Sequence, residues 1–266
     1  MGATVCMLSP TKELHRYNGN GTSWTKISGA VEDMGSGDWG LASRTLPGGT
    51  IYYYTGTPFE WESMGQPNGW YVVGSDTVYT KSPDAVYQFD GYAAGQPIWS
   101  QIGGTFWSIH AGPFGLFAAS DIQGTLWRYT GNPMEWEYIC PPPTSQLAVG
   151  EDTVYARFGN PSREIWSYDG AGTSWTKISQ PMQNMMLQYG GWGLVCTYVE
   201  GNSLLRYLGT PMQWQTIGAH TPRFAVADNT VYQAPYPNYQ EVYRYNGNGT
   251  SWTKIGGPSS GLVTMD

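Results

Sequence analysis

The chain has 266 residues, among them 36 glycines and 18 prolines, and only 12% of its residues are charged while 15% are aromatic. Glycine and proline at this density interrupt helices, so the composition argues against long helices. The formal charge of -7 argues against a nucleic-acid partner, because binding to phosphates needs clustered lysines and arginines.

The N-terminus, MGATVCMLSPTKELHR, lacks the basic start and the continuous apolar stretch of a signal peptide, and no run of 18 apolar residues occurs in the chain. We therefore expect a soluble protein without membrane insertion, either cytoplasmic or exported without a classical signal peptide. Cys6, Cys140 and Cys196 lie far apart with no CxxC spacing, which predicts buried thiols and neither a disulfide framework nor a zinc site. We expect no metal and no cofactor.

The segment RYNGNGTSWTKI occupies residues 16–27 and returns at residues 244–255. It belongs to a pattern, apolar-x-x-Tyr/Phe-x-Gly, a short gap, then Trp-x-x-Ile/Met, that recurs seven times. Successive tryptophans of the pattern are about 38 residues apart: Trp24, Trp61, Trp99, Trp136, Trp175, Trp214 and Trp252. The distance from the last of these through the termini to the first is again 38 residues. A repeat that closes on itself predicts a ring, whereas an open solenoid needs distinct caps.

Each repeat also contains two further short strands, and these are of two alternating types. In the first type an apolar run is followed by a Ser-Asp, Glu-Asp or Asp-Asn turn and then by Thr-Val-Tyr, in segments 70–83, 146–159 and 223–236. In the second type a glycine-flanked aromatic precedes the second strand, in segments 36–45, 111–120 and 189–198. Both patterns are typical of β-hairpins.

Four short strands in about 38 residues, repeated seven times, predict an all-β fold: a seven-bladed β-propeller with four antiparallel strands per blade. Residues 1–266 would form a single domain. Joining GLVTMD to GATVCMLSP produces a hairpin of the first type. We therefore expect a closing blade made of residues 261–266 plus 3–28, in which one C-terminal strand joins three N-terminal strands. The repeated tyrosines and tryptophans should pack between blades.

Catalytic chemistry has little support in the sequence. The three histidines, His15, His110 and His220, lie in different repeats and in no recognised catalytic motif. Asp76, Asp152 and Asp228 recur by repeat symmetry, so we expect them at separate hairpin turns and not in a carboxylate pair. We predict no catalytic residue and no enzyme, although a propeller fold does not exclude one.

Aromatic residues beyond those of the repeat lie on or near loops. An aromatic platform beside polar groups matches the apolar face and the hydroxyl edge of a sugar ring. The alternative is that these side chains fill space between blades or in the channel. The candidate sugar-binding residues are Trp39, Trp70, Trp107, Phe114, Trp192 and Tyr236.

The motif W-x-x-I-G-G, intact at residues 252–257, and the Y-x-G turn before it resemble the repeats of tachylectin-like and tectonin-like β-propeller lectins. The resemblance covers the whole chain in the order and spacing of the repeated residues, but not in sequence identity. It implies a non-enzymatic carbohydrate binder with sites between blades. Because the repeats differ in number and length from those of the tachylectin-like members, no ligand contact is carried over.

The leading hypothesis is a multivalent lectin with several similar sites for glycans or glycoconjugates, whose weak single-site affinities add up on a glycan-coated surface. The alternative is a non-enzymatic propeller scaffold for protein–protein interaction. Because seven is an odd number, the alternation of the two repeat types is interrupted at one place, the seam, where two repeats of the first type adjoin. If a site needs one particular pairing of the two types, the seam does not provide it. Fewer than seven sites would then be occupied.

Overall fold

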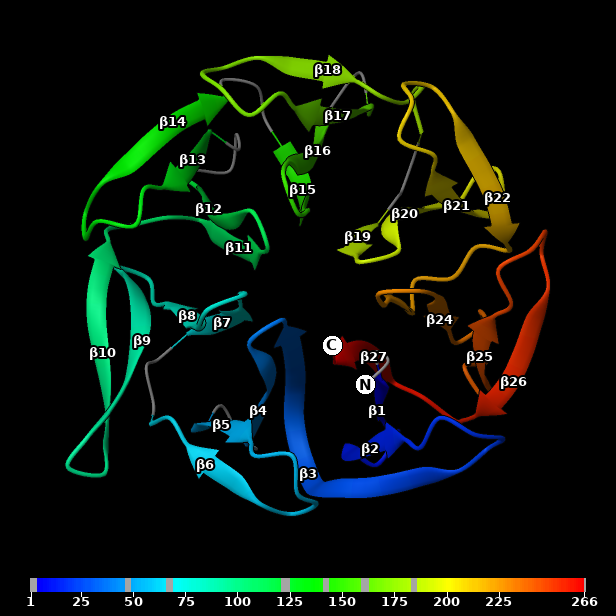
Figure 1. Cartoon of the computed structure of the whole chain (residues 1–266), viewed down its shortest axis with the longest axis horizontal. Coiled ribbons are helices and arrows are strands. Elements are labelled where there is room, and N and C mark those ends of the chain that lie inside the picture. The colour runs from blue at the N-terminus through cyan, green and yellow to red at the C-terminus, as the bar shows by residue number, and fades with distance from the viewer. Residues whose placement is uncertain are drawn as a thin grey trace.

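The computed structural model describes residues 4–45, 49–65, 69–120, 125–140, 144–158, 163–182 and 186–265. All regular structure in these ranges is β-strand, 27 strands in total, and the sheets are arranged around a ring (Figure 1). Within each four-stranded sheet the strands lie in chain order from the central channel to the outer edge, and neighbouring strands are antiparallel.

Five of the sheets have four strands each. The first two consist of β7 (Trp70–Val73), β8 (Val78–Lys81), β9 (Val86–Ala93) and β10 (Gln96–Gly103), and of β11 (Ser108–Gly112), β12 (Gly115–Ala119), β13 (Leu126–Tyr129) and β14 (Trp136–Cys140). The next two consist of β15 (Thr144–Val149), β16 (Val154–Phe158), β17 (Ile165–Tyr168) and β18 (Trp175–Lys177), and of β19 (Leu187–Gly190), β20 (Gly193–Tyr198), β21 (Ser203–Tyr207) and β22 (Trp214–Gly218). The fifth consists of β23 (Phe224–Val226), β24 (Val231–Gln233), β25 (Val242–Tyr245) and β26 (Trp252–Gly256).

A sixth sheet has seven strands, in the order β27-β1-β2-β3-β4-β5-β6. Its strands are β27 (Gly261–Met265), β1 (Thr4–Leu8), β2 (Glu13–Tyr17), β3 (Trp24–Gly37), β4 (Gly40–Thr45), β5 (Ile51–Tyr54) and β6 (Trp61–Ser63). The 14-residue strand β3 pairs with β2 through Trp24–Ala30 and with β4 through Val31–Gly37.

The prediction of seven separate four-stranded sheets was therefore wrong, because the structure has six hydrogen-bonded sheets. Strand β3 continues without a break where the sequence predicted a loop between blades. After the corresponding outer strands β18 and β26 the chain contains Pro181 and Pro258, whose missing N–H ends a ladder. The junction Ser28-Gly29-Ala30 has no proline, and there the pairing of β3 passes from β2 to β4 without a break.

The two ends of the described chain meet in one sheet, as the sequence predicted. β27 pairs with β1 in an antiparallel register that sets Thr4 opposite Met265 and Leu8 opposite Gly261 (Figure 1). Residues 3 and 266 of the predicted closing blade lie outside the described residues. Whether residues 1–266 behave as a single domain stays a prediction.

The repeat tryptophans connect neighbouring repeats around the ring. Each indole N–H donates to the backbone carbonyl that follows the preceding repeat tryptophan by three residues, at 2.6 to 3.0 Å. The donor and acceptor pairs are Trp24 and Ile255, Trp61 and Ile27, Trp99 and Met64, Trp136 and Ile102, Trp175 and Ile139, Trp214 and Ile178, and Trp252 and Ile217. Each indole also packs on the Tyr or Phe across its hairpin, with ring centroids 5.0 to 5.2 Å apart. The bond from Trp24 to Ile255 closes this series around the ring.

The hydrophobic core is divided among the spaces between sheets. One cluster, for example, joins Tyr79 and Val86 of one sheet to Ile109 and Leu116 of the next. A ring of sheets buries both faces of each sheet, so strands need apolar side chains on both faces. This explains why the core forms without helices.

The outer hairpins fall into two main classes. In the glycine hairpins (β2–β3, β17–β18 and β25–β26) the turn contains Gly21, Gly172 or Gly249 with a positive φ. In the proline hairpins (β5–β6, β13–β14 and β21–β22) a proline precedes a Phe or Met whose φ is 66°. The hairpin β9–β10 is longer and extends beyond the ring (Figure 1).

Cys6 and Cys196 are free and buried, as predicted, and burial raises the pKa of the Cys6 thiol to about 12. The side chain of Cys140 lies outside the described residues. Among the residues described, no helix has the length and apolarity needed to span a bilayer.

Candidate functional site

Three of the six candidate residues lie on hairpin turns beside the channel: Trp39 between β3 and β4, Phe114 between β11 and β12, and Trp192 between β19 and β20. Their backbone N–H groups donate to carbonyls of the following sheet. Trp39 bonds to Gly74 at 3.1 Å, while Phe114 bonds to Gly150 and Trp192 to Ala227, both at 2.8 Å. These turns therefore fasten one sheet to the next beside the channel.

The rings on these turns are each flanked by two other side chains. The guanidinium of Arg206 lies 3.7 Å from the Trp192 ring centroid, and Tyr245 of the next sheet lies 5.3 Å away. Phe114 lies between Arg128 and Tyr168, and Trp39 lies between Tyr53 and Phe89. A role for these three rings in sugar stacking stays a prediction, but their observed contacts are those of packing between sheets.

The other three candidates lie at the opposite ends of the inner strands or on loops there. Trp70 begins β7, Trp107 precedes β11, and Tyr236 lies on the loop between β24 and β25. They are among the most exposed large apolar side chains, with exposed fractions of 72%, 65% and 63%. Sequence reasoning had grouped all six residues, whereas the structure divides them between two faces of the ring.

A pocket of about 410 Å³ surrounds Tyr236. It is formed by the loop residues Pro235–Glu241 together with Lys254 on the adjacent strand β26. The ring of Tyr239 in this loop is held by the guanidinium of Arg223, 3.6 Å from the ring centroid. Rigid aromatic walls on a loop are a common basis for a small-ligand site.

The polar groups of this pocket include an ion pair. Lys254 Nζ lies 2.5 Å from Glu241 Oε1, and the hydroxyl of Tyr243 donates to Glu241 Oε2 at 2.5 Å. The hydrogen bond from Lys254 holds the pKa of Glu241 below its usual value. The same hydrogen bond raises the pKa of Lys254. Asn238 and Gln240 add amide groups. The pocket thus combines aromatic faces with donors and acceptors.

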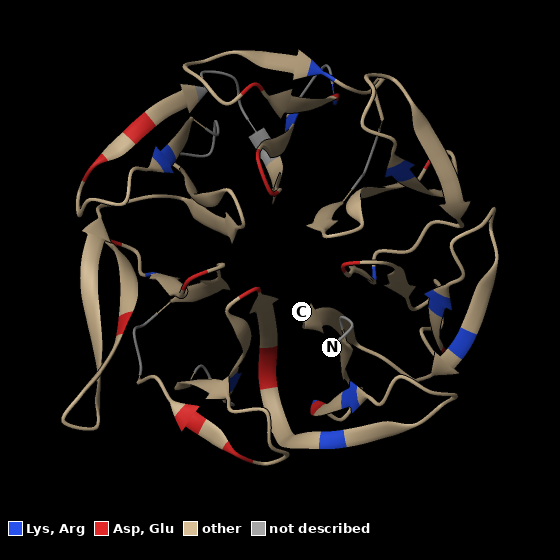
Figure 2. Ribbon diagram, in the orientation of Figure 1, with Lys and Arg blue, Asp and Glu red and all other residues tan. Residues whose placement is uncertain are grey.

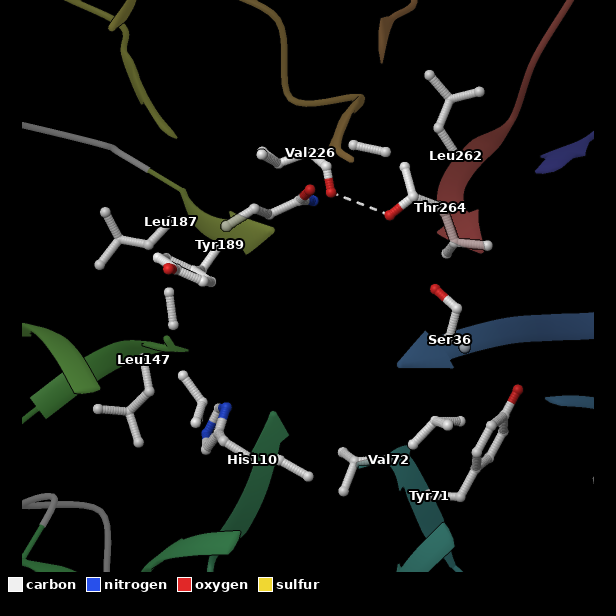
Figure 3. Close-up of a pocket in the computed structure, with 18 residues that line it drawn as sticks. Ser36, Tyr71, Val72, His110, Leu147, Leu187, Tyr189, Val226, Leu262 and Thr264 are labelled. Carbon is white, nitrogen blue, oxygen red and sulfur yellow. Dashed lines mark hydrogen bonds between the residues drawn. The ribbon is translucent and has the colours of Figure 1, made fainter. Parts of the chain in front are cut away.

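The central channel is a second cavity, with an inner part of about 350 Å³ (Figure 3). The strands nearest the channel form its wall, which contains apolar side chains together with Ser36, His110, Gln188, Tyr189 and Thr264. His110 lies 3.2 Å from Ser108 through its Nε2, and burial lowers its pKa to about 4. The imidazole is therefore neutral at pH 7.

The channel continues into a space of about 300 Å³ at the turns between the inner strands. Asp38, Glu151 and Asp228 line this part, and acidic residues gather at these turns in Figure 2. In the part of the chain that the structure describes, no group of three or more His, Cys, Asp and Glu side chains could hold a metal ion. Asp76, Asp152 and Asp228 lie at separate turns, as expected from repeat symmetry.

The ion pair of the pocket and its copies are not among the residues predicted from the sequence. Glutamate and lysine 13 residues apart also pair in the other two glycine hairpins, as Glu13 with Lys26 and Glu164 with Lys177. The signal was present as an E-x12-K spacing that ends on the lysine of TSWTK. The aromatic and glycine positions that define the repeat do not include this glutamate and lysine.

No family model matches the chain, and no curated protein matches it. The fold is similar to that of a functionally unknown protein from Desulfotomaculum acetoxidans, with a TM-score of 0.61, 10% identity and coverage of 100% of this chain and 99% of that one. It is similar to apo AztD from Citrobacter koseri, with a TM-score of 0.59, 10% identity and coverage of 99% and 98%.

Catalytically inactive virginiamycin B lyase from Staphylococcus aureus, solved with Quinupristin, matches with a TM-score of 0.59, 13% identity and coverage of 96% and 88%. Identities this low show the fold alone, which is β-propeller-like. None of these three is a tachylectin-like or tectonin-like lectin, so that resemblance stays a prediction. One neighbour is an enzyme by its description, and the expectation of a non-enzyme stays a prediction as well.

Proposed function

We propose that this chain is a multivalent carbohydrate-binding protein of the tectonin-like kind. The observation that carries the proposal is the pocket around Tyr236. Its aromatic rings can contact the apolar C–H face of a sugar, while Asn238, Gln240, Glu241 and Lys254 can exchange hydrogen bonds with hydroxyl groups.

We further infer that the ring consists of seven blades, the seven-stranded sheet counting as two because β3 belongs to both. The closed series of tryptophan bonds supports this count. A rigid ring presents similar loops in several directions, so it favours multivalent binding. The exposed Trp70 and Trp107 are the candidates for further contacts with glycans.

A protein-interaction scaffold is the second candidate function. Exposed Phe59 and Met134 on the outer hairpins favour it, because apolar side chains in solvent commonly mark contact surfaces. A partner of this kind would bind the outer edge and leave the Tyr236 pocket free. The two functions are therefore separable by mutation.

A glycan array with the whole chain tests the proposed function. We expect binding to neutral glycans, and we expect Tyr236→Ala to weaken binding at its pocket at least about tenfold, which corresponds to about 1.4 kcal/mol. Tyr138→Ala, an exposed tyrosine on the outer strand β14, is the matched control and should bind as the unmodified protein does. No binding above background to any sugar class would refute the proposal.

A further inference from the structure

The three glycine hairpins share a feature that the other hairpins lack. The Nζ–Oε1 distances are 2.6 Å for Lys26 and Glu13, 2.8 Å for Lys177 and Glu164, and 2.5 Å for Lys254 and Glu241. Aligned on the repeat tyrosine or phenylalanine and on the tryptophan, the corresponding positions elsewhere are uncharged. These are Thr50 and Ser63, Ala85 and Gln101, Thr125 and Tyr138, and Ser203 and Thr216. The pair is thus specific to one class of hairpin.

An aromatic side chain with a hydrogen-bond donor follows each glutamate by two residues. Each glutamate lies at the first position of its strand or directly before it. Residues two apart on a strand point to the same face, so His15 follows Glu13, Trp166 follows Glu164, and Tyr243 follows Glu241. Tyr243 donates to its carboxylate at 2.5 Å, and His15 Nε2 lies 3.8 Å from Glu13 Oε2. The indole N–H of Trp166 is buried and has no hydrogen-bond partner among the residues that the structure describes.

Stability alone gives little reason for three such pairs. An ion pair between partly exposed side chains contributes about 0 to 1 kcal/mol. The pairs also keep unused capacity, because a carboxylate offers about four lone-pair sites and an ammonium group about three donors. Each pair is thus prepared to exchange further hydrogen bonds without rearranging.

In the hairpin β25–β26 this pair lies in the wall of the Tyr236 pocket. A carboxylate and an ammonium held a fixed distance apart can bind two neighbouring hydroxyl groups, one as acceptor and one as donor. Vicinal hydroxyl groups are a general feature of sugar rings, and a carboxylate in the site disfavours sugars that are themselves acidic.

We propose that each glycine hairpin carries one carbohydrate site, so that the chain has three, each using its Glu–Lys pair to bind vicinal hydroxyl groups of a neutral sugar. This inference rests on the proposed function and adds the number and position of the sites. Trp24, in β3, donates to Ile255, in β26, so two of the sites lie on neighbouring sheets and the third lies further around the ring. The repeats that carry these two sites adjoin at the seam, where the alternation of the two repeat types is interrupted.

Calorimetric titration of the whole chain with a panel of methyl glycosides of neutral hexoses and of N-acetylhexosamines tests the inference. We expect three sites per chain for the sugar that binds. Lys26→Met, Lys177→Met and Lys254→Met should each reduce the number to two, and the triple variant should bind none. Lys81→Met, whose lysine lies on β8 outside the glycine hairpins, is the control and should keep three sites.

Each other outcome has a definite meaning. One site, seven sites, or three sites retained by the triple variant would overturn the inference while leaving a carbohydrate-binding function intact. Absence of binding by the unmodified protein would overturn both. Should a Lys→Met variant fail to show the unfolding transition of the unmodified chain, Glu241→Gln and its counterparts Glu13→Gln and Glu164→Gln replace it, with the same loss of one site each expected.

Discussion

At the scale of single residues, three large apolar side chains occupy a backbone conformation that suits glycine. Phe59, Met134 and Met212 each follow a proline, have a φ of 66° and are 62%, 59% and 42% exposed. The turn bond from the N–H of Glu60 to Thr57, 3.0 Å, and the proline are those of a type II turn, in which glycine is favoured at this position. The backbone N–H of Phe59, Met134 and Met212 each donates to a carbonyl of the preceding repeat, which holds the strained turn in place.

The left-handed conformation costs a residue with a Cβ about 1 to 2 kcal/mol. We therefore expect Met134→Gly to raise the free energy of unfolding by about 0.5 to 1 kcal/mol, since glycine removes the strain but has a more flexible unfolded chain. Urea unfolding followed by tryptophan fluorescence measures it.

The matched control is the reverse change in a glycine hairpin. Gly249 has a φ of 49° and its Cβ would meet nothing within 4 Å, so Gly249→Ala should lower stability by about 1 kcal/mol through the backbone alone. A loss of stability in Met134→Gly would contradict the argument and would mean that the exposed side chain itself stabilises the fold.

At the scale of elements, the tryptophan of each hairpin determines how that hairpin joins its neighbour. In the proline hairpins the acceptor carbonyl has a second donor: Ile178 accepts from the Trp214 indole at 2.8 Å and from the Met212 N–H at 3.0 Å. In the glycine hairpins no turn N–H among the described residues makes this second bond. Ile217 accepts from the Trp252 indole at 2.7 Å.

We expect Trp214→Phe to lower the free energy of unfolding by about 1 kcal/mol, because one hydrogen bond is lost while the carbonyl keeps a donor. Trp252→Phe should cost more, about 2 kcal/mol, because it takes from Ile217 the indole donor that no turn N–H replaces. Denaturant midpoints of the two variants give the difference. Equal losses would show that packing of the ring, and not the indole N–H, dominates.

At the scale of the whole molecule, the pairing of β27 with β1 holds the ring closed. Leu262 is buried in a cluster with Val5 and Tyr232, and Thr264 donates to Val226 at 3.0 Å, so β27 also contacts the sheet before it (Figure 3). Removing this strand exposes apolar surface and the free edge of β1 at once.

Deletion of residues 261–266 should therefore lower the free energy of unfolding by at least about 3 kcal/mol, and it should promote association through the exposed edge. Thermal unfolding and analytical ultracentrifugation measure the two effects. Deletion of residues 1–3, which precede β1, serves as the control. A truncated chain as stable and as monomeric as the full one would show that β27 is dispensable for closure.

Much of the architecture could be predicted from local pattern. Turn residues, alternating apolar side chains and the regular spacing of tryptophans are properties of short segments, and they indicated strands, hairpins and the pairing of the two ends. The continuity of β3 could not be predicted, because a strand that links two repeats differs from a loop only in the partners that its backbone finds. The candidate site was predicted in part, through Tyr236, whose loop position was readable from the prolines around it.

The sequence by itself determined the repeat, its period and its closure, because hydrophobic periodicity and turn chemistry act within a few residues. The tertiary structure alone decided which aromatic rings are covered and which are exposed. Trp192 and Trp70 look equivalent as loop tryptophans, yet Arg206 and Tyr245 flank the first while the second stands in solvent. Such differences depend on side chains that other strands and neighbouring sheets bring into contact, and a local pattern carries no record of those contacts.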